Sequence, residues 1–200
     1  MGQYYRLAFR RHGEDNVGVN GRKYRGSGYI SGKLMSTSYI GNFFVNAVCR
    51  ELQRNPCRIV WVGDYTEDDE LAKTTNGEVS MEMVYGSDPV HRFGSAKNFS
   101  YRGKYLVNLT KGVYISFDEY LKNHPEKDMD YGIEHPLPIL ASIGNGRGGG
   151  DYSGRNMDCV GSWAWDEISI TKKRPEGMEE ICPVFIEDDH ENKLDAEAEI

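Results

Sequence analysis

Alternating apolar and polar residues mark several strands in this 200-residue sequence, and helical patterns do not regularly separate them. Gln3–Arg11 is one such strand, and Lys104–Leu109 with Val113–Phe117 forms a hairpin around the turn Thr110–Gly112. Neighbouring parallel strands need a long crossover connection, usually a helix. The order of the patterns therefore predicts an α+β fold with a mainly antiparallel sheet.

One principal helix is expected over Tyr39–Arg54, with Asn55 and Pro56 ending it. Its apolar residues recur at spacings of three and four, which places them on one face: Phe43, Phe44, Ala47, Val48 and Leu52. The next segment, Cys57–Tyr65, contains the unbroken apolar run Ile59–Val62, which is typical of a central strand. We expect the helix to pack against this sheet and Trp61 to be buried.

The remaining expected elements are short. Asp118 is a plausible N-cap for a helix that ends at Asn123. Trp163 and Trp165 are two residues apart in an expected strand, so they would share a face, either filling the core or stacking on a ligand. The other expectations are strands at Pro138–Ile143, Val160–Thr171 and Ile181–Ile186, and a solvated acidic stretch at Glu67–Glu70.

The charge of the chain is unevenly distributed. Residues 1–58 hold ten Lys or Arg against three Asp or Glu, whereas residues 187–200 hold one against seven. The formal net charge is −7, so the whole protein is not a generic nucleic-acid binder. The basic N-terminal third either faces an anion or pairs with the acidic remainder. Length and charge predict one domain over residues 1–186 and a flexible acidic tail over 187–200.

The sequence offers few signs of membrane, secretory or metal chemistry. No apolar stretch is long enough for a membrane span, and no signal peptide follows Met1, so we expect a cytoplasmic protein with free thiols. The four cysteines and five histidines show no repeated ligand spacing, and no cofactor or catalytic motif is present. Asp64, Asp151 and Asp166 could converge on a metal, but their spacing does not test this.

The most unusual segment is a loop with six glycines in the eleven residues Gly144–Gly154. Glycines allow a backbone to approach a ligand closely and to direct successive N–H groups at one point. The loop lacks the Gly-Lys-Ser/Thr of a P-loop and does not open a helix as a dinucleotide fingerprint does. It is either a ligand-binding loop or a linker between two strands.

Two side chains in this loop suit an anionic ligand. Arg147 could grip a phosphate with two parallel hydrogen bonds, and Asp151 could accept from a sugar or base. Because glycines surround Arg147, we expect few neighbours for its side chain, and we expect Arg147→Ala to affect ligand affinity more than folding. The predicted ligand-binding residues are Gly144, Asn145, Gly146, Arg147, Gly148, Gly149, Gly150 and Asp151, with Asp64 after the buried strand and Lys33 before the principal helix.

Several segments together resemble a group of uncharacterised proteins of bacteriophages and bacteria. The resemblance rests on MGQYY at 1–5, GKLM at 32–35, SYIGN at 38–42, VWVGDY at 60–65, IGNGRGGGDY at 143–152 and GSW at 161–163. It spans most of the chain in order and brings no assigned catalytic residues. The phage association implies a protein that interferes with host defence, for example by sequestering a nucleotide signal in the host cytoplasm.

The leading hypothesis is a non-enzymatic binder of a small anionic, nucleotide-like ligand, with a Tyr or Trp stacking on a ring. One alternative is an enzyme that acts on the same ligand class, such as a metal-assisted hydrolase. The other is a protein-interaction module with a tyrosine-rich surface and the acidic tail facing a partner. Neither a cofactor nor a membrane partner is expected, and an oligomer is possible.

Overall fold

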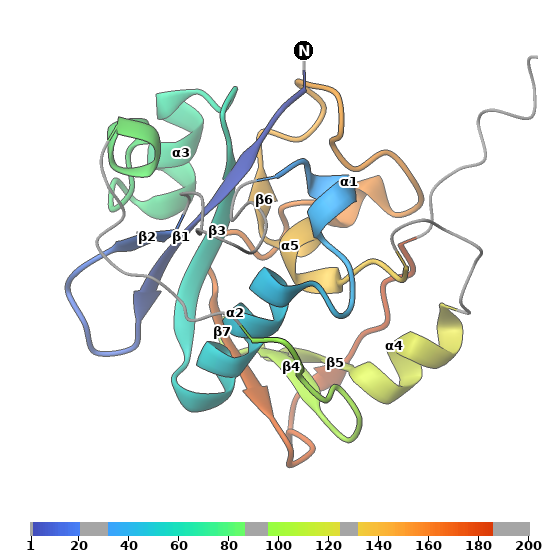
Figure 1. Cartoon of the computed structure of the whole chain (residues 1–200). Coiled ribbons are helices and arrows are strands. Elements are labelled where there is room, and N and C mark those ends of the chain that lie inside the picture. Colours follow the sequence, from blue (N-terminus) through green and yellow to red (C-terminus); the bar gives the residue numbers. More distant parts are fainter. Residues whose placement is uncertain (1, 21–31, 87–95, 125–131, 186–200) are drawn as a thin grey trace, which may run out of the picture.

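The computed structural model describes residues 2–20, 32–86, 96–124 and 132–185. Its framework is an eight-stranded sheet in the order β2-β1-β3-β7-β4-β5-β8, with β6 paired to β3 beside this path. Most strand pairs are antiparallel, whereas β3–β6 and β5–β8 are parallel. Helices pack on the sheet (Figure 1), so the expected α+β fold is confirmed. The predicted tail 187–200 lies outside the described residues.

The elements have these bounds. The strands are β1 Tyr5–Arg11, β2 Gly18–Asn20, β3 Cys57–Gly63, β4 Tyr105–Asn108, β5 Val113–Ser116, β6 Ser142–Ile143, β7 Glu167–Thr171 and β8 Glu179–Glu180. The helices are α1 Leu34–Thr37, α2 Phe43–Arg54, α3 Asp68–Thr75, α4 Phe117–Asn123 and α5 Pro136–Leu140, with a π-helical turn at Glu82–Gly86 and a 3₁₀ turn at Met157–Cys159. Across the described parts of the chain, no helix has the length and apolar character needed to cross a bilayer.

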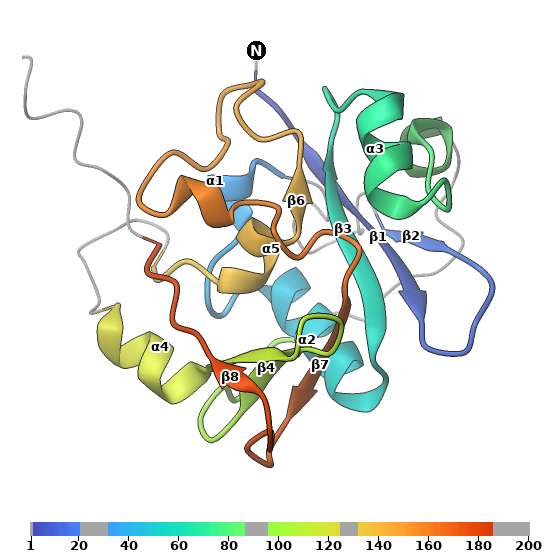
Figure 2. The same ribbon diagram turned by 180° about the vertical axis from the view of Figure 1, so that it is seen from behind.

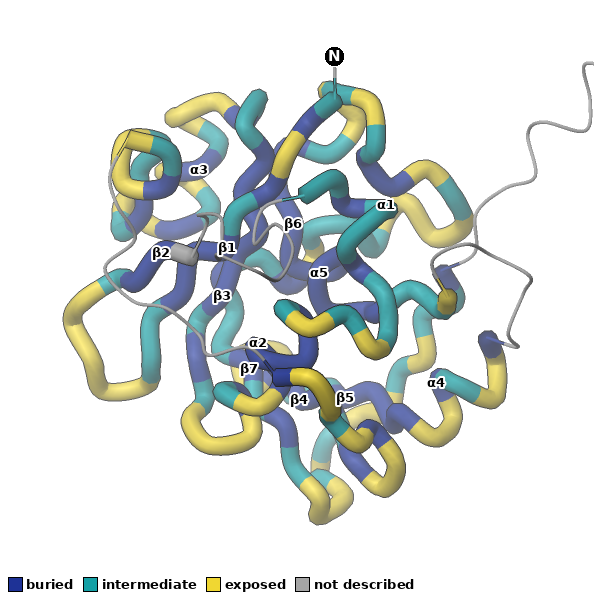
Figure 3. The backbone as a smooth tube through the Cα atoms, viewed as in Figure 1, coloured by how far each residue is buried: buried dark blue, intermediate teal, exposed yellow. Residues whose placement is uncertain are grey.

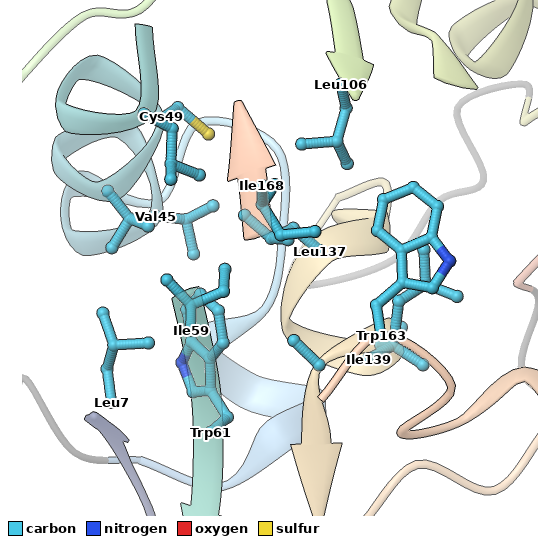
Figure 4. Close-up of a cluster of buried hydrophobic side chains, with 14 of the residues drawn as sticks. Leu7, Val45, Cys49, Ile59, Trp61, Leu106, Leu137, Ile139, Trp163 and Ile168 are labelled. Carbon is cyan, nitrogen blue, oxygen red and sulfur yellow. The ribbon is translucent and has the colours of Figure 1, made fainter. Parts of the chain in front are cut away.

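Strand β3 is buried on both sides because each face of the sheet carries its own apolar core (Figure 3). Ile59 and Trp61 point into the larger core, where Figure 4 shows them beside Val45 of α2. Val60 and Val62 point into the smaller core, which α3 covers. This arrangement explains the unbroken apolar run, and Trp61 is buried as expected.

The principal helix forms within its predicted bounds. Asn42 caps α2 by accepting hydrogen bonds from the backbone N of Phe44 (2.9 Å) and Val45 (3.2 Å). The helix ends at Arg54, before the expected Asn55 and Pro56. Phe43 is the exception to the predicted buried face, since as the first helical residue it is half exposed.

The predicted strand Pro138–Ile143 is wrong for most of its length. Its first part belongs to α5, and only Ser142 and Ile143 form a strand, β6. Pro136 begins α5, where a missing backbone N–H costs nothing because the first turn has no intrahelical acceptor. His135 caps this helix, with its Nδ1 accepting from the N of Leu137 at 3.1 Å.

The two tryptophans do not share a strand face. The strand predicted over Val160–Thr171 begins only at Glu167, and the residues before it form turns. Trp165 adopts a left-handed backbone conformation (φ 62°), which reverses its direction relative to Trp163. Trp163 enters the larger core and Trp165 the smaller one, so packing is confirmed as the role of both.

The acidic stretch Glu67–Glu70 is largely exposed, as expected, and its last three residues form the first turn of α3, where carboxylates favour helix formation. Two shorter expectations differ from the structure. Ser116, rather than Asp118, caps α4, and Asp118 instead accepts from the N of Gly103. The predicted strand Ile181–Ile186 does not form over its described residues 181–185, and β8 ends just before them at Glu180. The β4–β5 hairpin is confirmed.

Candidate functional site

The glycine-rich loop lies against the N-terminal segment and the start of α1. The backbone N of Gln3 donates to the carbonyl of Gly149 at 3.1 Å, and the N of Met35 donates to the carbonyl of Gly150 at 3.1 Å. Gly150 has φ 90°, and a side chain there would collide with the stem of Lys33. The loop therefore needs glycine for close packing within the protein itself.

The backbone donors of the loop converge on a carboxylate that belongs to the loop. Oδ2 of Asp151 accepts from the N of Gly146 (2.7 Å), of Arg147 (2.9 Å) and of Gly148 (3.0 Å). Its Oδ1 accepts from the hydroxyl of Tyr5 at 2.8 Å. The loop thus forms the kind of anion-binding concavity that was predicted, but a buried internal anion occupies it.

Two further contacts fix this arrangement. The Asn145 side chain donates to the carbonyl of Tyr152 (3.0 Å) and accepts from the N of the same residue (2.7 Å), which closes the loop. Burial and the hydrogen bond to Asp151 raise the pKa of Tyr5, so its hydroxyl remains a donor. An external anion would have to displace Asp151 to use the loop donors, and a ligand there stays a prediction.

Arg147 has more partners than its glycine-rich surroundings indicate. One guanidinium nitrogen donates to the carbonyl of Tyr65 at 3.0 Å, and the other lies 2.8 Å from a carboxylate oxygen of Glu70. Glu67 lies 3.5 Å away. The expectation of few neighbours is therefore wrong, because the fold brings the start of α3 to the loop. Arg147 links the loop to that helix.

The two remaining predicted residues border the same N-terminal segment. Asp64 follows β3, and its Oδ1 accepts from the N of Tyr4 at 3.0 Å. The stem of Lys33 passes over Gly2 and Gly150. The structure thus brings Lys33 to the loop, whereas the side chain of Asp64 contacts Tyr4 of the N-terminal segment. The third aspartate considered for a metal, Asp166, is elsewhere, hydrogen-bonded to Asn108.

A cavity of about 350 Å³ lies at the ends of β1 and β3, away from the loop. Its lining is almost entirely polar, and we call it the arginine pocket: Arg10, Arg11, His12, Gly13, Glu14, Asp15, Arg58 and Glu167. Arg10 and Arg58 face each other as a register pair of β1 and β3. Like charges at such a position destabilise a sheet. Glu78 compensates the charge of Arg10, with which it forms an ion pair.

The arginines of the pocket are only partly engaged. Arg10 forms an ion pair with Glu78. Arg11 Nε lies 2.6 Å from Glu51, and its Nη1 lies 3.6 Å from Glu14, which also lines the pocket. Arg58 donates through one nitrogen to the carbonyl of Trp165 at 3.2 Å. A guanidinium has five N–H donors, so these contacts leave donors for a ligand.

A histidine–glutamate pair completes the pocket. His12 Nδ1 lies 2.5 Å from Oε1 of Glu167, and 72% of the His12 side chain is exposed. This contact orients the imidazole and leaves Nε2 available at the pocket. Among the described residues, no group of three or more His, Cys, Asp and Glu side chains has an arrangement that could hold a metal ion.

The arginine pocket was not predicted as a site. In the sequence, Arg10 and Arg11 belong to the end of a predicted strand, His12 to the loop after it, and Arg58 to the start of another predicted strand. The one sequence signal was the excess of positive charge in residues 1–58, for which an anionic partner was one of two interpretations. Comparison with family models, curated proteins and solved structures yields no match. The resemblance to phage proteins stays a prediction.

Proposed function

We propose that this protein binds a small anionic, nucleotide-like ligand in the arginine pocket. The observation that carries the proposal is the facing pair Arg10 and Arg58 at a cavity of about 350 Å³. An anion between them would relieve their repulsion and accept several charge-assisted hydrogen bonds. Cavities of roughly 300–1,000 Å³ are typical of small-molecule sites.

The pocket supports this proposal better than the glycine loop does. Asp151 already accepts from three loop N–H groups, whereas the arginines keep donors that no described residue is shown to use. Glu14, Asp15 and Glu167 also line the pocket. These carboxylates would accept from donor groups of the ligand, such as sugar hydroxyls, and would disfavour a ligand that is anionic throughout.

The test is calorimetric titration of the full chain with pyrophosphate, ADP and a panel of other nucleotides. We expect Arg58→Gln to weaken binding at least tenfold, as the loss of a charge-assisted contact does. Lys122→Gln on α4 is the matched control, since it removes one positive charge far from the pocket. Equal affinities for wild type and Arg58→Gln would exclude the pocket, and no binding of any panel member would contradict the ligand class.

The His12–Glu167 pair favours one alternative, an enzyme that hydrolyses the same ligand class. Nε2 of His12 would take a proton from water while the water oxygen attacks phosphorus, and the leaving group would depart with the bond electrons. Denaturing the protein after incubation distinguishes the two functions, because a binder releases intact ligand and an enzyme releases product. His12→Gln would abolish product formation and retain binding.

A further inference from the structure

A group of basic side chains on the described surface has no acidic partner among the described residues. Elsewhere many cations are paired, as Arg11 is with Glu51 and Arg147 with Glu70. The group, which we call the basic surface, comprises the exposed side chains of Arg50, Arg54, Lys97 and Lys172 together with the buried Lys104. Arg54 lies close enough to Glu51 to lower the pKa of that carboxyl but forms no ion pair with it.

These residues come from three adjacent segments. Arg50 on α2 donates to the carbonyl of Asn98 at 2.9 Å, which places Lys97 beside that helix. Arg54 follows one turn later on α2. Lys104 and Lys172 lie one position beyond the Tyr105–Thr171 register pair of β4 and β7. Figures 1 and 2 show α2, β4 and β7 close together from both sides, and β4 pairs with β7.

The charges around Lys104 are mainly positive. The side chain is buried, and its Nζ lies 3.7 Å from the ring centre of Phe99. Burial and the positive charges of Lys172 and Arg50 lower the pKa of Lys104. Asp118 accepts from the N of Gly103, the residue before Lys104. An anion bound here would remove an uncompensated repulsion.

We propose that the acidic segment 187–200 of the same chain docks on the basic surface. Charge complementarity is the first argument: the segment has seven Asp or Glu and one Lys, in a chain with a net charge of −7. That net charge disfavours an external polyanion. The segment is tethered to the protein, so its effective concentration at the surface is in the millimolar range.

The position where the described chain ends provides the second argument. The N of Phe185 donates to Nε2 of His124 at 2.9 Å. His124 directly follows the last residue of α4. The other end of α4 touches the basic surface, because the N of Phe117 donates to the carbonyl of Lys104 at 3.0 Å. A helix of this length spans about 10 Å. Residues 186–200 could extend over roughly 50 Å and so have ample reach.

Zero-length carbodiimide cross-linking of the full chain tests the docking directly, since it joins only amines and carboxylates in contact. We expect cross-links from Lys97 and Lys172 to carboxylates of 187–200 within monomers, reduced at least fivefold in 0.5 M salt. Lys73 on α3 is the control amine: it is exposed and lies on the opposite side of the sheet. Equal cross-linking of Lys73 would overturn the proposal, as would cross-links found only between chains.

A second measurement covers the case of an external partner. In the full chain, Asp→Asn and Glu→Gln changes throughout 187–200 should strengthen binding of a labelled short heparin about tenfold. Adding Arg50→Glu and Lys172→Glu should reverse that gain, whereas Lys73→Glu should not. If the wild-type chain binds a labelled oligonucleotide as tightly as the neutralised variant does, the basic surface serves a nucleic acid and the proposal is wrong.

Discussion

The glycine loop and the arginine pocket use the same chemistry in opposite ways. In the loop, three N–H groups and the Tyr5 hydroxyl meet a carboxylate from within the protein. In the pocket, Arg10 and Arg58 face each other beside a cavity, and Arg10 forms an ion pair with Glu78 whereas Arg58 donates to a backbone carbonyl. A segment with an unusual sequence can therefore be structural, whereas ordinary-looking strand ends can hold the donors that a ligand needs.

The largest expected effect is on the loop. Asp151→Ala should lower the free energy of unfolding by about 3 kcal/mol or more, because it leaves several buried donors without an acceptor. Asp151→Asn should lower it less, since the amide oxygen can still accept. Urea unfolding measures both. A change within about 0.5 kcal/mol for Asp151→Ala would mean that the loop donors are not held by Asp151 and are open to a ligand.

The second prediction concerns the effect of pH on stability through two buried histidines, His124 and His135, which limits the pH range for comparing the loop with the pocket. Burial lowers the pKa of His135 to about 3, and it also lowers the pKa of His124. Below about pH 6.5 the unfolded chain takes up these protons and the folded chain does not. The free energy of unfolding should therefore decrease as the pH is lowered below about 6.5. For His135 this decrease should approach ~1.4 kcal/mol for each pH unit.

Urea unfolding at pH 7.5, 6 and 5 measures this loss. His12→Gln is the control: His12 is exposed in the pocket, so the slope should persist in that variant. Protonation of His124 should also release Phe185, whose N–H donates to its Nε2. A pH-independent stability between 7.5 and 5 would contradict the burial of these neutral imidazoles.

The smallest expected effect is that of Arg147→Ala on stability. The same variant tests whether the loop or the pocket binds the ligand. Arg147→Ala should cost about 0.5–1 kcal/mol of stability, because its ion pairs with Glu67 and Glu70 are partly exposed. Ligand affinity should be unchanged if the pocket is the site. If the loop is the site, affinity should fall by about 1.5–3 kcal/mol, the value expected for a charge-assisted contact. Thermal unfolding with and without ligand measures both quantities.

The large elements of the fold could be predicted from local patterns. Helix α2 follows from apolar spacing with Pro56 after it, and β3 follows from the run Ile59–Val62. Helix α5 was missed because its residues are all apolar and lack a helical period. The direction of Trp165 depends on a positive φ, which is unusual for such a residue and leaves no signal in the sequence.

The candidate sites required long-range information. The loop could be recognised from its glycines. That the Asp151 side chain fills it could not be predicted, because the convergence of N–H groups on Asp151 depends on the φ angles of Gly146 and Gly150. Arg10 and Arg58 meet only through the β1–β3 register, which the sequence does not specify. The position of the pocket could therefore not be predicted from the sequence, and binding of an anion stays a prediction.

Nuclear magnetic resonance titration with ADP compares both regions in one experiment. The account predicts concentration-dependent shifts in the backbone amides of Arg11, Gly13 and Arg58, with Gly146 and Gly148 unchanged because Asp151 holds them. Shifts in Gly146 and Gly148 with an unperturbed pocket would contradict the account and place the anion in the glycine loop.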